Sequence, residues 1–256
     1  GIIFINNFFS LFLLISLRLF NCHKESTSFM NKIFKEKKPP SDTFRLGMLL
    51  SLVGGFVDAY TFIVRGKVLA NAQTGNIIFF GLSLIEKKWE KTFFFFLPIF
   101  AFVIGILIAE FIRTTFKNSK IHWRQIIILI EILVLFICAF IPKGNLDVFV
   151  NISISFMCSL QVQAFRKVNG NLSSTTMCTG NLRSASDFLY YSLFSKDPNI
   201  KKSAKKNTLI YFGLIIFFII GAIMGSFFSE LIYERAVLVA SFMLLIIFVV
   251  MFKNEI

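Results

Sequence analysis

Long apolar runs alternate with short polar stretches from about residue 46 to the end of the chain. Runs of roughly 20 apolar residues predict membrane-spanning helices, and the alternating ten-residue strands of a membrane barrel are absent from the sequence. The pattern therefore predicts an all-α integral membrane protein, a helical bundle. Its eight apolar segments cover about 46–64, 69–86, 92–112, 125–141, 148–165, 173–194, 208–232 and 236–252.

The second and sixth segments are poor spans because polar residues interrupt them. Each contains the triplet Thr-Gly-Asn, as Thr74-Gly75-Asn76 and as Thr179-Gly180-Asn181. We call these two the TGN segments. In lipid, such polar side chains and broken backbone are tolerated only where they are buried in protein or line a cavity. We therefore expect about six full spans plus two broken or re-entrant TGN segments.

The triplet recurs after 105 residues, and each copy follows an alanine, Ala59 or Ala164, by the same interval. The same shift superimposes several apolar residues around the motif without a gap. The sequence thus predicts two membrane repeats, 46–145 and 146–256, with four segments each. Many transporters consist of two such repeats, with the binding site near the midplane of the bilayer at the repeat interface.

Lysine and arginine residues mark the cytoplasmic loops of membrane proteins. If the TGN segments turn back without crossing, more of the Lys and Arg residues fall on the cytoplasmic side than if all eight segments cross. Three crossings per repeat is an odd number, so the second repeat would enter the membrane upside down. We predict inverted repeats; eight crossings with parallel repeats is the alternative.

Composition supports a membrane protein, with 56% hydrophobic residues, 35 phenylalanines and only 16% charged residues. The net charge of +13 lies in loops between apolar runs, which indicates topology signals, so we expect a lipid bilayer and no nucleic acid as partner. The basic stretch 30–45 predicts a cytoplasmic leader. Residues 1–29 are interpreted as an extension that precedes a start at Met30, or as an N-terminal anchor.

Carboxylates within the apolar segments are the first candidates for chemistry. Asp58 lies in the first segment, where a central aspartate costs roughly 2.5–3.5 kcal/mol on insertion scales. It could bind a cation or proton, or it could reach water near the end of the span beside Arg65. Glu131 is flanked by apolar residues on both sides and could relay protons or pair with Arg183 or another buried donor.

In the second repeat, Gln163 takes the position of Asp58, with Gln161 two residues before it. The two amides could line a polar site, or they could hydrogen-bond neighbouring helices. The TGN triplets suit a helix break whose free backbone groups bind an ion or an anionic substrate. Alternatively, Gly75 and Gly180 allow close helix packing, as the spacing of Gly221 and Gly225 also suggests.

Metal, cofactor and catalytic chemistry find no support in the sequence. The four cysteines form no CxxC pair, and both histidines lie in charged stretches outside the apolar segments. No Ser-His arrangement or HExxH motif occurs, so we expect no metal, no cofactor and no enzyme activity.

Two stretches carry a family resemblance: GGFVDAYTF before the first TGN, and Gln161-x-Gln163-Ala164-Phe165-Arg166 before TTMCTGNLR in the second repeat. With them the chain resembles the YoaK-like family of uncharacterised bacterial multi-pass membrane proteins, over about residues 46–252. The resemblance implies a multi-pass protein of the bacterial inner membrane and implies no activity.

The leading functional hypothesis is a small secondary transporter or permease-like protein that binds a small solute or ion between its repeats. The alternative is a non-transporting membrane scaffold or partner-binding subunit whose polar residues satisfy one another, and a homo-oligomer is compatible with both. The candidate site residues are Asp58, Thr74, Gly75, Asn76, Glu131, Gln161, Gln163, Thr179, Gly180 and Asn181.

Overall fold

A computed structural model describes residues 44–115, 123–168, 171–172 and 175–253. All of them belong to one compact unit, Pro39–Ile256. The N-terminal extension expected at 1–29 and most of the leader expected at 30–45 lie outside the described residues.

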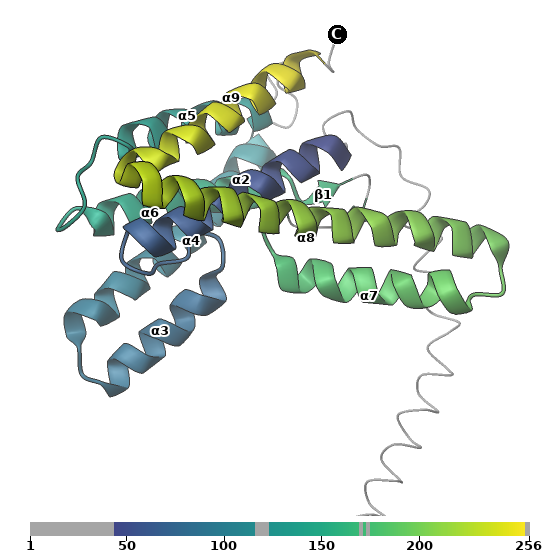
Figure 1. The fold of residues 1–256 in the computed structure, drawn as a ribbon, viewed down its shortest axis with the longest axis horizontal. Coiled ribbons are helices and arrows are strands. Elements are labelled where there is room, and N and C mark those ends of the chain that lie inside the picture. The colour runs from purple at the N-terminus through teal and green to yellow at the C-terminus, as the bar shows by residue number, and fades with distance from the viewer. Residues whose placement is uncertain (1–43, 116–122, 169–170, 173–174, 254–256) are drawn as a thin grey trace, which may run out of the picture. The chain divides into compact units, whose positions relative to one another are not determined.

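The described chain is almost entirely helical, and each apolar segment of the sequence corresponds to one α-helix (Figure 1). A two-residue strand pair lies between α6 and α7, with Lys167 opposite Leu172. The elements in chain order are α2 (Phe44–Val64), α3 (Gln73–Ile85), α4 (Trp89–Thr115), α5 (Trp123–Cys138), α6 (Asp147–Ala164), β1 (Lys167–Val168), β2 (Asn171–Leu172), α7 (Cys178–Phe194), α8 (Pro198–Ile232), the 3-10 helix η2 (Tyr233–Ala236) and α9 (Val237–Lys253).

The TGN segments differ from the other six because their first residues are not helical. Helix α3 begins only at Gln73 and has 13 residues, and α7 begins only at Cys178. No side chain caps the N-terminus of either helix. Residues 69–71 and 175–177, directly before them, have no helical structure. Each TGN triplet thus lies in the first turn of a helix that follows an irregular loop.

Three helical stretches in the described residues are long and apolar enough to cross a bilayer. They are α2, α4 and the stretch Pro198–Met251, which joins α8, η2 and α9. Helix α5, with 16 residues, is shorter than these, and α6 carries Asn151, Gln161 and several serines among its 18 residues. The fold is therefore almost entirely helical and compatible with a membrane protein.

Helices α2 and α8 pack closely because glycines line their contact. A Cβ added at Gly221 would lie 1.9 Å from the carbonyl oxygen of Leu52, and one added at Gly225 would lie 2.4 Å from that of Phe56. The sequence interpretation of these two glycines as packing residues is therefore confirmed. The residue numbers of the contacting positions increase together in the two helices, so α2 and α8 run parallel.

Helices α4 and α6 form a second contact of the same kind. A Cβ added at Gly105 would lie 2.8 Å from the carbonyl oxygen of Phe156 and 1.8 Å from the Ser159 hydroxyl. Further along, Gln163 of α6 donates a hydrogen bond to Glu110 of α4. The contacts again advance together, so α4 and α6 run parallel.

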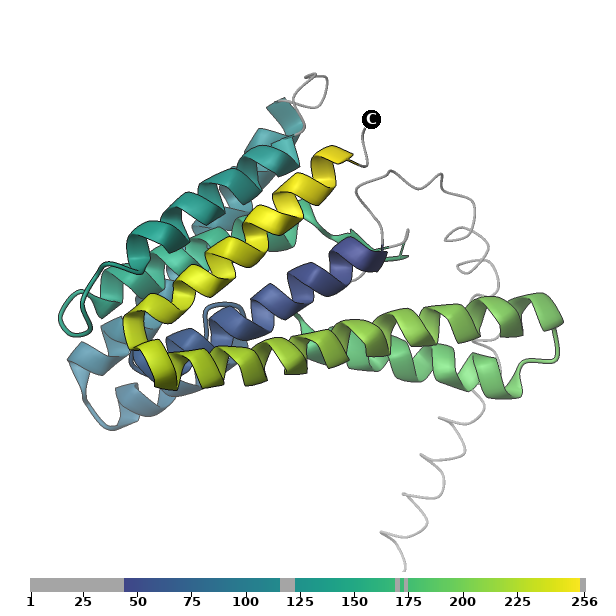
Figure 2. The same cartoon turned by 45° about the horizontal axis from the view of Figure 1, so that its top comes forward.

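The first four helices and the last four helices of the described unit pair with their neighbours in corresponding ways. Helix α2 packs on α8 and α9, and α6 packs on α4 and α5. Helix α3 forms a hairpin with α4, α7 forms a hairpin with α8, and α5 lies beside α9 (Figure 2). Each contact of one helix quartet thus has a counterpart in the other, with α2, α3, α4 and α5 corresponding to α6, α7, α8 and α9. The main apolar core lies between α2, α5, α6 and α9.

Candidate functional site

The chain turns back along α2 directly after that helix ends. In this first loop, residues 66–72, the backbone N–H of Asn71 donates to the Asp58 carboxylate at 2.7 Å. The Asn71 side-chain amide reaches the carbonyl oxygen of Gly54 at 3.3 Å. Gly54 lies ten residues before the end of α2, or roughly 15 Å along the axis at 1.5 Å per residue. The first loop is therefore inserted deep beside the middle of α2.

Asn76 of the first triplet holds this loop in place. Its side-chain oxygen accepts from the backbone N–H of Leu69 at 2.9 Å, and its amide donates to the carbonyl oxygen of Leu69 at 2.7 Å and to Gln73 at 2.8 Å. Thr74 is exposed, and Gly75 contacts the Leu69 side chain. The triplet thus fixes the loop geometry, while the residues before it face α2.

The second loop, residues 175–177, reaches the same turn of α2. Thr175 and Thr176 are both buried, and a Cβ added at Gly54 would lie 2.5 Å from the methyl carbon of Thr176. In the triplet that follows, Asn181 is buried, whereas Thr179 and Gly180 are exposed. Gly54 therefore stands between Asn71 of one loop and Thr176 of the other. We call this meeting point of the two loops on α2 the junction.

Several buried polar atoms at the junction have no hydrogen-bond partner among the described residues. They are the side-chain oxygens of Asn71, Thr175 and Thr176. The Cys158 thiol lies near Asn71 but forms no hydrogen bond with the Asn71 side-chain oxygen. Buried polar groups without partners are rare because each loses its hydration without compensation. Three such oxygens belong to the two loops that meet at the junction.

Two carboxylates flank the same region. Asp58 is 5% exposed and Glu131 1% exposed, and Cys158 of α6 lies within electrostatic range of both. One Glu131 oxygen has no hydrogen-bond partner. In the described part of the chain neither carboxylate forms an ion pair, and Arg183, the partner considered for Glu131, is exposed on α7. These acids are buried without a basic partner there.

The two glutamines of α6 lie in different surroundings. Gln161 is buried and its amide nitrogen has no hydrogen-bond partner. Gln163 is half-buried and donates to Glu110 of α4, which also pairs with Arg113. Gln163 therefore links two helices near the end of α6, whereas its counterpart Asp58 contacts the first loop.

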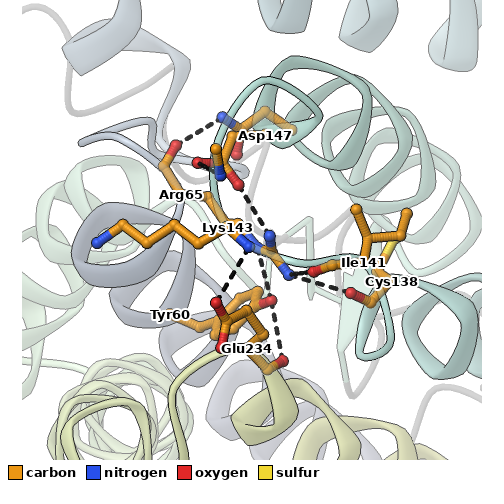
Figure 3. Close-up of polar contacts among 9 residues, drawn as sticks. Tyr60, Arg65, Cys138, Ile141, Lys143, Asp147 and Glu234 are labelled. Carbon is orange, nitrogen blue, oxygen red and sulfur yellow. Dashed lines mark hydrogen bonds and ion pairs between the residues drawn. The ribbon is translucent and has the colours of Figure 1, made fainter.

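A second polar cluster, around Arg65, closes the bundle where α2 ends (Figure 3). The Arg65 side chain is fully buried. It pairs with Asp147 at 2.8 Å and donates to the Tyr60 hydroxyl at 2.9 Å. It also donates to the backbone carbonyls of Cys138 at 3.1 Å and Ile141 at 2.8 Å. One guanidinium thus joins the ends of α2 and α5 to the start of α6.

Neighbouring contacts extend the Arg65 cluster to η2. Tyr60 donates to the carbonyl oxygen of Glu234 at 3.2 Å, and the Glu234 carboxylate accepts from the backbone N–H of Lys143 at 3.0 Å (Figure 3). Burial would lower the pKa of Arg65, but its hydrogen bonds to Asp147 and Tyr60 raise the pKa above its ordinary value. The guanidinium is therefore charged at every physiological pH.

A family model describes these residues as a protein of unknown function, DUF1275, and it matches residues 46–250. The chain belongs to this family. The resemblance to YoaK-like membrane proteins seen in the sequence is consistent with that membership. Searches of curated proteins and of solved structures found no match.

Sequence reasoning missed the residues that shape the junction most directly, Asn71 and Thr176. Both lie three residues before the threonine of a triplet, so they occupy equivalent positions of the 105-residue repeat. Their equivalent positions in the repeat are a sequence signal that could have identified them. Arg65 gave no such signal, because an arginine after an apolar run is the usual mark of a span end. Among the described residues, no group of three or more His, Cys, Asp or Glu side chains could hold a metal ion.

Proposed function

We propose that this protein is a small secondary transporter of the inner membrane, built from two inverted repeats, 46–145 and 146–256. Its site is the junction, where two loops from different repeats meet the middle of α2. The observation that carries the proposal is the convergence of Asn71 and Thr176 on Gly54 beside the buried carboxylate of Asp58. Transporters with inverted repeats bind their solutes at such broken helices near the midplane.

The helix ends support inverted repeats with six crossings. Arg65 after α2, Ile141 after α5, Asp147 at the start of α6 and Glu234 after α8 all lie in one cluster. Helices α2, α5 and α8 therefore end on one side of the bundle, and α6 and α9 begin there. Helix α4 is parallel to α6 and also begins there. Consequently α2 and α6, the first helices of the two repeats, run in opposite directions.

With a cytoplasmic leader before α2, the Arg65 cluster lies at the outer face. The first loop then enters from outside and the second from the cytoplasm, and the short helices α3 and α7 each lead back to the side from which their loop came. This arrangement leaves six full spans and two re-entrant TGN segments. It satisfies the requirement that irregular backbone at membrane depth is buried in protein.

Alternating access requires one end of the site to be closed while the other can open. The Arg65 cluster closes the outer end with buried and partly buried hydrogen bonds from four elements. At the opposite end, Glu110, Gln163 and Arg113 are exposed or half-buried. The difference supports a conformation that is closed to the outside.

The scaffold alternative also has an observation in its favour. Asn76 satisfies the backbone of its own loop, and Asp58 accepts a backbone hydrogen bond, as expected of polar residues that satisfy each other. The unpartnered oxygens of Asn71, Thr175 and Thr176 favour transport instead, because a closed structural core would pair them.

Water access separates the two functions. In a variant with all four native cysteines replaced, Thr176→Cys should react with a membrane-impermeant thiol reagent from the cytoplasmic side. Leu214→Cys, fully buried in α8, is the unreactive control, and Lys201→Cys, exposed near the start of α8, is the reactive one. Failure of Thr176→Cys to react from either side, with both controls behaving as stated, would favour the scaffold.

A further inference from the structure

We infer that the junction binds a monovalent cation such as Na⁺, held by Asp58 together with the side-chain oxygens of Asn71 and Thr176. The inference deepens the proposed function, since it names the class of ion that the transporter would use. It rests on three features of the junction: a buried carboxyl group without an ion pair in the described residues, unpartnered oxygens, and a ligand set that suits a monovalent ion.

The first feature is the surroundings of the buried Asp58 carboxyl group. The Asn71 N–H donates to its carboxylate, and the backbone of Ala70 and Ala72 contacts it as well. Hydrogen bonds from N–H groups favour the ionised form of a carboxyl group, whereas burial away from water favours the neutral form. Yet no ion pair reaches Asp58 within the described residues. A buried carboxylate without a counter-charge is costly, and a bound cation supplies that charge.

The second feature is the set of oxygens beside Asp58. Asn71 is 4% exposed and Thr176 3% exposed, and the side-chain oxygen of each lacks a partner. Both side chains lie against Gly54, one turn of α2 before Asp58. A Cβ added at Gly54 would lie 2.5 Å from the Thr176 methyl carbon, so the Thr176 side chain would have to shift. Two loops thus bring two side chains that carry unpartnered oxygens to the turn of α2 before Asp58.

The third feature is the type of ligand. Oxygen donors bind hard cations, whereas transition metals prefer imidazole and thiolate. Calcium sites generally use several carboxylates, and magnesium sites use one or two carboxylates together with several water molecules. No group of three or more acidic, His or Cys side chains gathers in the described part of the chain. One carboxylate with neutral oxygens matches the charge of a monovalent ion. Unwound segments of inverted-repeat transporters coordinate such ions.

Thermal unfolding of the purified full chain in detergent tests the inference. NaCl is titrated against choline chloride at constant ionic strength, with LiCl and KCl as further arms. Binding to the folded state should raise Tm by about 5–10 °C at a hundredfold excess over Kd. Asp58→Asn should abolish the rise. Asp187→Asn, which removes an exposed carboxylate of α7, should keep it.

Thr176→Val removes the hydroxyl while keeping the shape, and should weaken the apparent Kd for the cation by roughly tenfold. Equal Tm in choline and in all three alkali ions would overturn the inference, as would a rise that persists in Asp58→Asn. If Tm rises only when the pH is lowered, and by the same amount in choline chloride as in the alkali chlorides, the site binds a proton and the inference is also overturned.

The outcomes separate this inference from the proposed function. If no alkali ion stabilises the protein while Thr176→Cys reacts with the thiol reagent, the cation site falls and the transporter stands. If Na⁺ stabilises the protein through Asp58 while Thr176→Cys stays unreactive from both sides, the cation site stands and the transporter falls.

Discussion

The two ends of the bundle use charged residues in opposite ways. At one end, Arg65 is fully buried and joins α2, α5 and α6 through an ion pair and backbone carbonyls. At the other, Glu110 pairs with Arg113 and Gln163 in partly exposed positions. Buried charge networks are costly to break, whereas exposed pairs contribute little. The difference teaches that the bundle is held firmly at one end and weakly at the other.

The largest effect should follow removal of the buried guanidinium. Arg65→Met leaves Asp147 unpaired and the carbonyls of Cys138 and Ile141 without their donor. Breaking one partner of a buried pair costs about 3–5 kcal/mol. Unfolding of the purified protein in a denaturing detergent should report a loss of this size. A loss no larger than that of Arg113→Met would show that the Arg65 cluster does not hold the end together.

A smaller effect should follow at the first loop. Asn76→Ala removes both side-chain hydrogen bonds to the Leu69 backbone. The N–H and carbonyl groups of Leu69 then lose these partners in an apolar environment. The expected cost is about 1–3 kcal/mol in the same unfolding measurement. Thr74→Ala, two residues earlier and exposed, is the matched control and should change stability by less than about 0.5 kcal/mol. Equal effects of the two variants would remove Asn76 from its role in fixing the loop.

At the weakly held end, Arg113→Met should cost less than about 1 kcal/mol, because the pair with Glu110 is exposed and screened. The loss should also shrink as salt is added, whereas that of Arg65→Met should not. A salt-independent loss of several kcal/mol at Arg113 would equalise the two ends and contradict the comparison.

The smallest effect concerns pH at the firm end. Hydrogen bonds from its own backbone N–H and from that of Lys143 lower the pKa of Glu234, and partial burial opposes this. A depressed carboxyl pKa stabilises the fold above the ordinary pKa of glutamate, and that contribution is lost as pH falls through the depressed value. Glu234→Gln should therefore flatten the acid limb of the stability curve slightly. Because Glu234 is only half-buried, we expect a difference below about 1 kcal/mol.

Much of the fold could be predicted from the sequence, because apolar runs and their polar breaks follow directly from burial in an apolar environment. All eight segments correspond to helices, and the late starts of α3 and α7 follow from the polar residues before Thr74 and Thr179. The length of α8 was not predicted. Seven of its first ten residues are polar, four of them lysines, and this part of α8 pairs with α7.

The site was harder to predict because it depends on packing between segments far apart in the chain. Asp58 and Glu131 were found as carboxylates in apolar runs, but their approach to Cys158 required the fold. Asn76 looked like a ligand and holds its own loop instead. The burial of Arg65 depends on the carbonyl of Cys138 in α5 and on Asp147 of α6, which no local pattern encodes.

The most direct test of inverted repeats compares two equivalent turns, α3–α4 and α7–α8, which contain Lys88 and Lys196. Single cysteines at these positions, in a chain otherwise free of cysteine, are labelled in intact cells and in inverted vesicles. We predict that Lys88→Cys reacts only from outside, as Lys143→Cys does, and that Lys196→Cys reacts only from the cytoplasm. Labelling of Lys88→Cys and Lys196→Cys from the same side would contradict inverted repeats and favour parallel ones.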